Sequence, residues 1–359
     1  MRKTAFCVII IIVGMFLLGA RPAAAAPSYT YQNVGVGGPT FGAIYAYGLS
    51  GVGQVAGSDG GRAFLYNGAI HDLGMLPDPY NVSSNGYAVN AAEQVAGCSW
   101  GPSFGHAFLY SGGVMHNLGT LVPAPGDGNS LAYGINDAGQ VVGESFPNGG
   151  AHHAFLYGNG VMQDLNNLVQ NLPANTVLNS ARAINTAGQV AGSAAVKISQ
   201  FTSHSHAFLY SGGNMQDLGT LGGDNSTAYA ISTTGLVAGK SEISSTLTIP
   251  PTHAFLWKSG VGMQDLGTLP APYNVESQAY GVNAAGQVVG YSYPASGPPH
   301  AFLYSGGVMY DLNNLVNNLP QGVVFQYAYG INDRGQIIAN AYLLTPVPPL
   351  SGLDMLLLD

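Results

Sequence analysis

Short apolar segments of about five residues recur along the chain and alternate with turns that are rich in glycine, serine and asparagine. In one stretch the segments occupy residues 279–283, 287–291, 300–304 and 308–312. This length suits β-strands and is too short for helices. Glycine-bearing loops at 284–286 and 305–307 separate the first two and the last two segments, which is typical of hairpins. One copy of the pattern therefore predicts a four-stranded antiparallel meander.

Two phrases repeat along the chain with a period of about 44 to 53 residues. The first, His-Ala-Phe-Leu-Tyr or a near match, occurs at 62–66, 106–110, 153–157, 206–210, 253–257 and 300–304. The second reads Tyr-Gly-Ile-Asn-x-x-Gly-Gln-Val-Val-Gly and is clearest at 133–143, 280–290 and 329–336. A repeat of this length favours propeller blades over the shorter coils of leucine-rich proteins.

The number of copies of each strand indicates how the repeats close. A fourth-strand phrase, Met-Gln-Asp-Leu-Gly or a near match, occurs six times, and a weaker version at 31–35 precedes every other repeat. The last copy has a shortened third strand at 341–344 and no fourth strand. A propeller joins such complementary ends, because pairing the first strand into the last blade leaves no open edge. We therefore predict an all-β, seven-bladed β-propeller of four-stranded antiparallel blades, closed by the N-terminal strand near 29–34.

The N-terminus is typical of a secretory signal peptide. Arg2 and Lys3 precede an apolar run at 5–18 and a small-residue stretch that ends at Ala26. The run is shorter than the about 20 residues that span a membrane, and no later segment approaches that length. We expect residues 1–25 to be removed, 26–345 to form the propeller, and 346–359 to be a short C-terminal tail. The protein is then secreted, to the extracellular space or the periplasm.

Charge and cysteine content narrow the possible partners. Charged residues make up only 7% of the chain, and loss of the signal peptide leaves six basic against 17 acidic residues. Such a surface repels phosphate backbones and anionic lipids, so we expect no nucleic-acid binding. Cys7 leaves with the signal peptide, and Cys98 alone forms no disulfide within the chain. We interpret Cys98 as a small buried apolar residue.

The residues at 106–110, 135–143 and 215–223 resemble the HAF-type extracellular repeat of bacteria. The resemblance extends over about residues 31–345. It implies an exported protein, and it implies no particular reaction.

The recurring histidines of the first phrase invite a metal-site interpretation, but each blade has one and the histidines therefore lie on a ring. Zinc requires three or four ligands that meet at one point. We expect instead that each histidine bonds a polar partner on a neighbouring strand and fixes the blade geometry. The predicted structural residues are His106, His153, His206, His253 and His300, with Asp164, Asp217, Asp265 and Asp311. In the first blade, Arg62 takes the place of the histidine and is expected to pair with Asp72. In the second blade, Asn117 takes the place of the aspartate.

A binding site is expected on the face that carries the long connections, at 193–205, 241–252 and 292–299. The position after the second-strand glycine also varies between copies, and it supplies Glu144 and Lys240 as candidate ligand contacts. Aromatic residues predicted in long loops can stack on sugar rings. The candidate ligand-binding residues are Trp100, Tyr273, Tyr293, Glu144 and Lys240.

No Gly-x-Ser-x-Gly, His-Glu-x-x-His or phosphate-loop motif is present, and we predict no catalytic residues, metal or cofactor. The favoured function is a secreted, non-enzymatic binding module for an extracellular polysaccharide or surface protein. One alternative is a glycan-active propeller enzyme, a hydrolase or lyase, with Glu144 or Glu242 as acid or base. Another is a purely structural coat or matrix protein.

Overall fold

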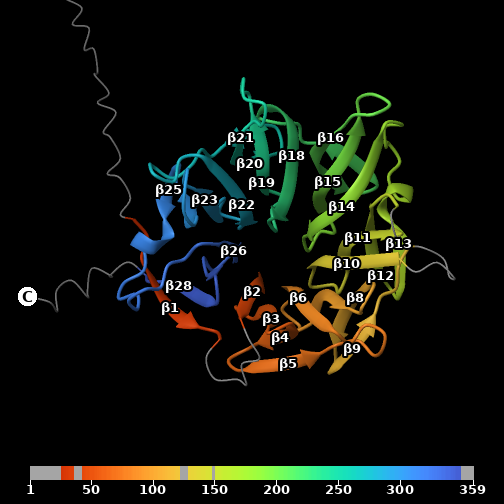
Figure 1. Cartoon of the computed structure of the whole chain (residues 1–359), viewed down its shortest axis with the longest axis horizontal. Coiled ribbons are helices and arrows are strands. Elements are labelled where there is room, and N and C mark those ends of the chain that lie inside the picture. The colour runs from red at the N-terminus through yellow and green to blue at the C-terminus, as the bar shows by residue number, and fades with distance from the viewer. Residues whose placement is uncertain (1–25, 36–42, 122–127, 148–149, 349–359) are drawn as a thin grey trace, which may run out of the picture.

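The computed structural model describes residues 26–35, 43–121, 128–147 and 150–348. Within these residues the chain forms seven four-stranded sheets arranged around a central axis (Figure 1). This confirms the predicted seven-bladed propeller. The predicted signal peptide at 1–25 and all but residues 346–348 of the predicted tail lie outside the described residues.

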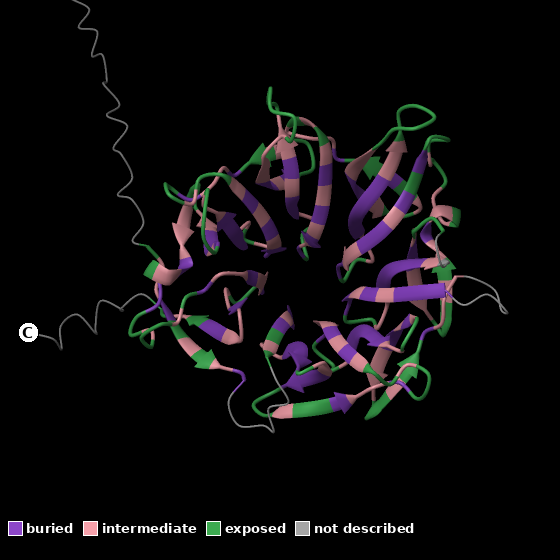
Figure 2. Ribbon diagram, in the orientation of Figure 1, coloured by how far each residue is buried: buried purple, intermediate pink, exposed green. Residues whose placement is uncertain are grey.

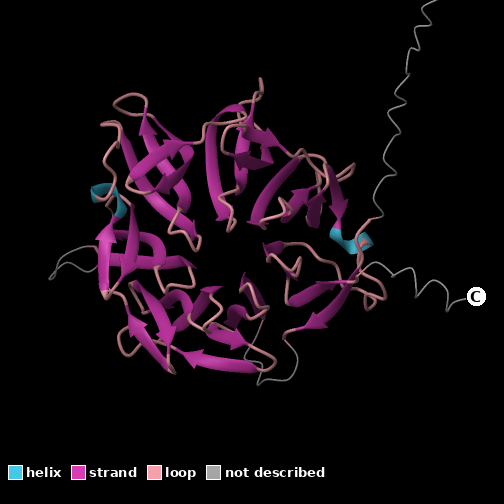
Figure 3. Cartoon of the chain, turned by 180° about the vertical axis from the view of Figure 1, so that it is seen from behind, coloured by secondary structure: helices cyan, strands magenta, loops and turns pink. Residues whose placement is uncertain are grey.

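Six blades are built from four consecutive antiparallel strands. Blade 1 contains β2 (Ile44–Leu49), β3 (Val55–Asp59), β4 (Arg62–Tyr66) and β5 (Ile70–Gly74), and blade 2 contains β6 (Ser83–Val89), β7 (Val95–Trp100), β8 (Gly105–Ser111) and β9 (Val114–Asn117). Blade 3 contains β10 (Gly128–Ile135), β11 (Val141–Pro147), β12 (His153–Gly158) and β13 (Val161–Asp164), and blade 4 contains β14 (Thr176–Ile184), β15 (Val190–Lys197), β16 (Ser203–Ser211) and β17 (Asn214–Asp217). Blade 5 contains β18 (Gly222–Ile231), β19 (Val237–Ile243), β20 (Thr252–Lys258) and β21 (Gly262–Asp265), and blade 6 contains β22 (Glu276–Val282), β23 (Val288–Tyr293), β24 (His300–Ser305) and β25 (Val308–Asp311). Two short 3-10 turns, η1 (Leu165–Asn167) and η2 (Leu312–Asn314), follow β13 and β25, as Figure 3 shows from behind.

Blade 7 combines both ends of the described chain. Its strands β26 (Ala328–Ile331), β27 (Ile337–Ala339) and β28 (Tyr342–Pro346) are completed by β1 (Tyr29–Asn33). β1 lies antiparallel to β28, with Thr30 opposite Thr345. The red and blue strands are side by side in Figure 1. The N-terminal strand thus closes the ring as predicted.

Every blade has a β-bulge between its first and second strands, at the same position of the repeat. A bulge leaves one residue of the first strand unpaired and re-aims its side chain. The bulged residues are Tyr47, Tyr87, Tyr133, Arg182, Tyr229, Tyr280 and Tyr329. Their side chains line the central channel, and we refer to these seven residues as the channel ring.

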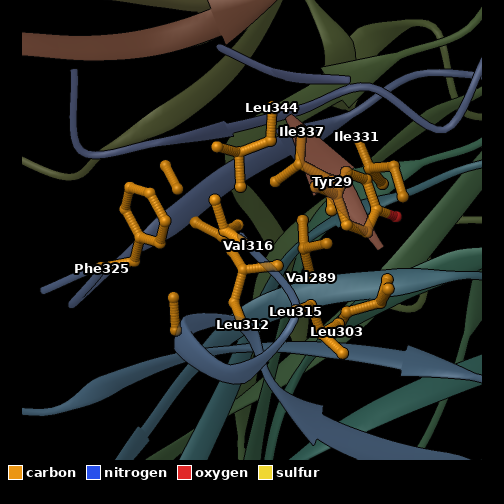
Figure 4. Packing of buried hydrophobic residues seen from close by; sticks show 13 residues of the cluster. Tyr29, Val289, Leu303, Leu312, Leu315, Val316, Phe325, Ile331, Ile337 and Leu344 are labelled. Carbon is orange, nitrogen blue, oxygen red and sulfur yellow. The ribbon is translucent and has the colours of Figure 1, made fainter. Parts of the chain in front are cut away.

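The apolar core is divided among the seven blade junctions of the described chain. Buried positions concentrate in the strands and exposed positions in the connections (Figure 2). At the junction between blades 6 and 7, Tyr29 of β1 packs in the same cluster as Val289 and Leu344 (Figure 4). Each blade therefore completes its core only against its neighbours.

The asparagine of the second phrase links neighbouring blades on the far side of the apolar layer. Asn136 Nδ2 donates to Gln140 Oε1 at 2.8 Å within its own turn and to the Asn185 carbonyl of the next blade at 3.1 Å. Asn90, Asn185, Asn283 and Asn332 make the same pair of bonds. We call this set the asparagine belt. Because Asn332 reaches the carbonyl of Ser50, the belt crosses the junction where the ring closes.

Candidate functional site

The channel ring surrounds a cavity of about 390 Å³. Below the ring is a layer of small residues, and below that a layer of aliphatic residues: Leu49, Val89, Ile135, Ile184, Ile231, Val282 and Ile331. A second cavity of about 190 Å³ follows at the level of the asparagine belt. The first strand of each blade starts at the face with the long connections, and the ring residues come before the aliphatic ones. The aromatic end of the channel therefore opens toward the face on which the sequence predicted a site.

Contacts between neighbouring aromatic rings run around most of this circle. The ring-centroid separations are 4.6 Å for Tyr229–Tyr280, 5.7 Å for Tyr280–Tyr329, 5.6 Å for Tyr329–Tyr47, 5.4 Å for Tyr47–Tyr87 and 5.9 Å for Tyr87–Tyr133. The Arg182 guanidinium carbon lies 4.1 Å from the Tyr133 ring centroid. Such mutual packing fixes the orientation of each side chain.

Burial raises the pKa values of five ring tyrosines. Desolvation, with a smaller contribution from Tyr229, raises the pKa of Tyr280 to about 12. Burial also raises the pKa values of Tyr47, Tyr87, Tyr133 and Tyr329 above the usual value of 10. A neutral phenol both donates and accepts hydrogen bonds. The ring therefore presents hydroxyls and aromatic faces, not negative charge, at neutral pH.

Glu144, which the sequence identified as an outlier, lies directly behind the ring in blade 3. Its Oε1 accepts a hydrogen bond from the Tyr133 hydroxyl at 2.8 Å. Its Oε2 is 3.9 Å from Arg182 Nη2 and 3.7 Å from His152 Nδ1. The equivalent position in blade 6 is Tyr291, whose hydroxyl is 3.4 Å from that of Tyr280. In blades 3 and 6, the residue after the second-strand glycine thus supports the ring from behind.

Tyr293 belongs to an aromatic cluster that continues from the ring across blades 6 and 7. Its ring contacts Tyr291 edge-on at 5.2 Å, and Tyr291 contacts Tyr327 at 4.9 Å. Tyr327 in turn stacks on Tyr329 of the ring at 5.9 Å. Of the predicted ligand-binding residues, Tyr293 and Glu144 are therefore the two that the structure connects to the channel ring.

The other predicted ligand contacts lie elsewhere. Trp100 ends β7 and its indole lies against Gly105 of the same blade. The Tyr273 ring stacks on His300 at 3.8 Å, and its hydroxyl bonds His300 Nε2 at 2.6 Å. Lys240 is half-buried on β19 of blade 5. The ring face and the hydroxyl of Tyr273 thus both contact His300 within blade 6.

The long connections are shorter than the sequence suggested, because the flanking strands extend into them. β15 runs to Lys197 and β16 begins at Ser203, so most of the predicted connection at 193–205 is hairpin strand. In blade 5, Glu242 accepts hydrogen bonds from the backbone of Asp224 and Asn225 at 3.1 Å. Glu144 and Glu242 are therefore held by separate partners in different blades.

The recurring histidines pair with the fourth-strand residues named from the sequence. The Nδ1–Oδ distances are 2.6 Å for His153–Asp164, 2.7 Å for His206–Asp217, 2.9 Å for His253–Asp265, 2.7 Å for His300–Asp311 and 3.1 Å for His106–Asn117. Arg62 Nε donates to Asp72 at 2.8 Å in blade 1. The described residues contain no group of three or more histidine, cysteine or acidic side chains placed to hold a metal ion. They also include no helix long and apolar enough to cross a membrane.

Comparison with known proteins supports the fold and gives no family. No protein-family model and no curated protein matches the chain. Among solved structures, the extracellular domain of a one-component system from B. thetaiotaomicron is similar, with a TM-score of 0.50 and 9% identity over 90% of this chain. This chain covers only 40% of that chain.

Two other solved structures align over most of both chains. A gluconolactonase from Xanthomonas campestris has a TM-score of 0.41 and 14% identity, covering 91% of this chain and 93% of its own. The β-propeller domain of the Trilobed protease from Pyrococcus furiosus has a TM-score of 0.43 and 9% identity, covering 87% and 98%.

Proposed function

We propose that the protein is a secreted, non-enzymatic propeller of the HAF-repeat type that binds a saccharide at the aromatic end of its channel. The observation that carries this proposal is the channel ring, in which bulges aim six tyrosines and Arg182 into one cavity of about 390 Å³. Cavities of this size hold small ligands. Tyrosine faces stack on the C–H faces of sugars, while phenol hydroxyls bond sugar hydroxyls.

The arrangement of carboxylates favours binding over glycan cleavage. Glycoside hydrolysis uses two carboxyl groups on either side of the scissile bond, about 5 to 10 Å apart. Among the described residues that line the cavity, none is an aspartate or glutamate. Glu144 accepts a hydrogen bond from the Tyr133 hydroxyl behind the ring, and Glu242 is held by backbone amides of blade 5. Binding is thus the simplest use of this site.

A glycan-binding screen of the mature chain tests the proposal. Tyr47→Ala and Tyr280→Ala each remove one aromatic face, and we expect them to weaken binding of the captured saccharide about tenfold. Phe201→Ala is the matched control, because Phe201 is 92% exposed on the connection between β15 and β16. Trp100→Ala and Tyr293→Ala, made in parallel, test the two aromatic residues that the sequence predicted in loops and that the structure places at the ends of β7 and β23.

Unchanged affinity in both ring variants, with melting temperatures that show intact folding, contradicts the channel site. Release of new reducing ends from the bound glycan contradicts the non-enzymatic proposal. Secretion has its own test: a bacterial host is expected to export the protein with Ala26 as its N-terminus, read by mass spectrometry. Full-length protein retained in the cytoplasm contradicts it.

A further inference from the structure

Arg182 is the single member of the channel ring that is not a tyrosine. It occupies the same bulge in blade 4 that a tyrosine occupies in the other six blades. Among the described residues that line the cavity, Arg182 is the only charged one. One sector of an otherwise neutral aromatic ring therefore carries a positive charge.

The guanidinium of Arg182 lies between an aromatic ring and a carboxylate. It lies over the Tyr133 ring at 4.1 Å, which is a cation–π contact, and its Nη2 is 3.9 Å from Glu144 Oε2. That separation is too long for a hydrogen bond. Its Nε is buried and has no partner among the described residues. The side chain is 30% exposed, so the outer donors reach the cavity.

Unused guanidinium donors in a partly buried site point to the ligand group that completes them. The outer N–H groups of the planar guanidinium match a carboxylate in bidentate geometry. The Glu144 carboxylate, fixed by Tyr133, holds the guanidinium in place but leaves the fork open. Tyrosines on the opposite side of the ring, Tyr329 and Tyr47, offer faces for the ligand's ring.

We infer that the saccharide is acidic and that Arg182 binds its carboxylate, as in a hexuronate residue. This inference rests on the proposed function, because it takes the channel ring as the binding site. The chain carries a formal charge of −8, so long-range attraction does not bring an acidic ligand to the protein. Recognition of the acid is therefore local, through the guanidinium fork.

Calorimetric titration of the mature chain with a hexuronate oligosaccharide, and with its methyl ester, tests the inference. We expect the acid to bind roughly tenfold more tightly than the ester, since a charge-assisted bidentate pair is lost on esterification. Arg182→Tyr restores the residue found in the other blades, so it is compatible with folding. It is expected to remove the preference for the acid while the ester still binds.

Arg334→Gln is the matched control, because Arg334 is an exposed arginine in the turn between β26 and β27 and donates to the Val52 carbonyl. It is expected to keep the wild-type preference. Equal affinity of the wild type for acid and ester, or an unchanged preference in Arg182→Tyr, overturns the inference and leaves the channel proposal standing. Tighter binding of a sulfated oligosaccharide than of the hexuronate also overturns it. Unchanged saccharide affinity in Tyr47→Ala and Tyr280→Ala overturns both proposals.

Discussion

At the scale of single residues, the bulge on the first strand and the glycine on the second strand depend on each other. In blade 3 the Leu131 carbonyl points at Gly143, and a Cβ there would overlap it. The same Cβ would lie 2.7 Å from the Phe155 ring, which is fully buried. Glycine is therefore the residue that lets the two strands approach while the bulge aims Tyr133 into the channel.

Gly143→Ala is expected to destabilise the protein by about 2–3 kcal/mol, because the added methyl group has no space and forces backbone shifts. The free energy of unfolding in urea measures this. Gly51→Ala is the control, since Gly51 is exposed, has an ordinary φ and has nothing within 4 Å of the added Cβ. Its effect is expected to stay within about 0.5 kcal/mol. Equal losses in both variants would show that the close approach is not required.

The buried tyrosines make stability depend on alkaline pH. Burial raises the pKa values of Tyr29 and Tyr280 to about 12, above the value of 10 for an exposed tyrosine. Between pH 10 and about 12, these tyrosines are deprotonated in the unfolded chain and still protonated in the native chain. The free energy of unfolding therefore falls as the pH rises. The contribution is fully present below pH 10 and is lost as pH rises through about 12. Tyr280→Phe is expected to flatten this decline in urea unfolding between about pH 10 and 12. An unchanged slope would contradict the burial of this hydroxyl.

At the scale of elements, side chains reinforce the short outer strand of blade 4. β17 has four residues, and Asp217 at its end bonds His206 through Oδ2 and the Gly219 amide through Oδ1. Ser226 of the next blade donates to the Gly219 carbonyl at 2.6 Å and accepts from the Ala207 amide. The fourth strand is thereby joined to its own blade and to the following one.

Asp217→Ala is expected to lower the free energy of unfolding by about 1 kcal/mol. A hydrogen bond to a fully buried charge contributes more, but the Asp217 side chain is 43% exposed to solvent. Faster amide exchange should appear first in β17, since the histidine contact and the turn bond are lost together. Asp224→Ala provides the comparison, because Asp224 is 71% exposed and its carboxylate lies 3.8 Å from His204. If both variants exchange alike in β17, the histidine–aspartate pair does not hold the strand.

Elements were predictable where a count or a spacing determines them. The unpaired phrase at 31–35 and the missing fourth strand at the other end predicted the closure. The recurrence of one histidine and one aspartate in each copy predicted their hydrogen bond between neighbouring strands. The channel ring was not predicted, because a bulge shifts the two-residue alternation by one and hides which way Tyr133 faces. A tyrosine at the same place in six of seven copies was the available signal. Tyr273 was predicted as a ligand contact because it is an aromatic residue in a long connection, and only coordinates reveal its bond to His300.

At the scale of the whole molecule, the ring has no independent part. Each of the seven apolar clusters of the described chain contains residues from two neighbouring blades. Separating two blades therefore exposes buried apolar residues on both of them. β1 contributes to both junctions of blade 7, with Tyr29 in the cluster facing blade 6 and Val34, which follows β1, in the cluster facing blade 1. Five cross-strand pairs between β1 and β28 therefore determine whether the remaining six blades keep their packing.

A disulfide across this closure tests that dependence directly. Thr30 and Thr345 are exposed and opposite each other, which places the Cα atoms within the range that a disulfide bridges. Thr30→Cys with Thr345→Cys joins residues 315 positions apart, and a loop of this length is expected to stabilise the oxidised chain by about 4–5 kcal/mol. Burial raises the pKa of Cys98, so this thiol does not compete for the bridge. Reduction should return the melting temperature to that of the wild type, and a bridge that forms only between two chains would show that β1 closes a neighbouring molecule's ring instead of its own.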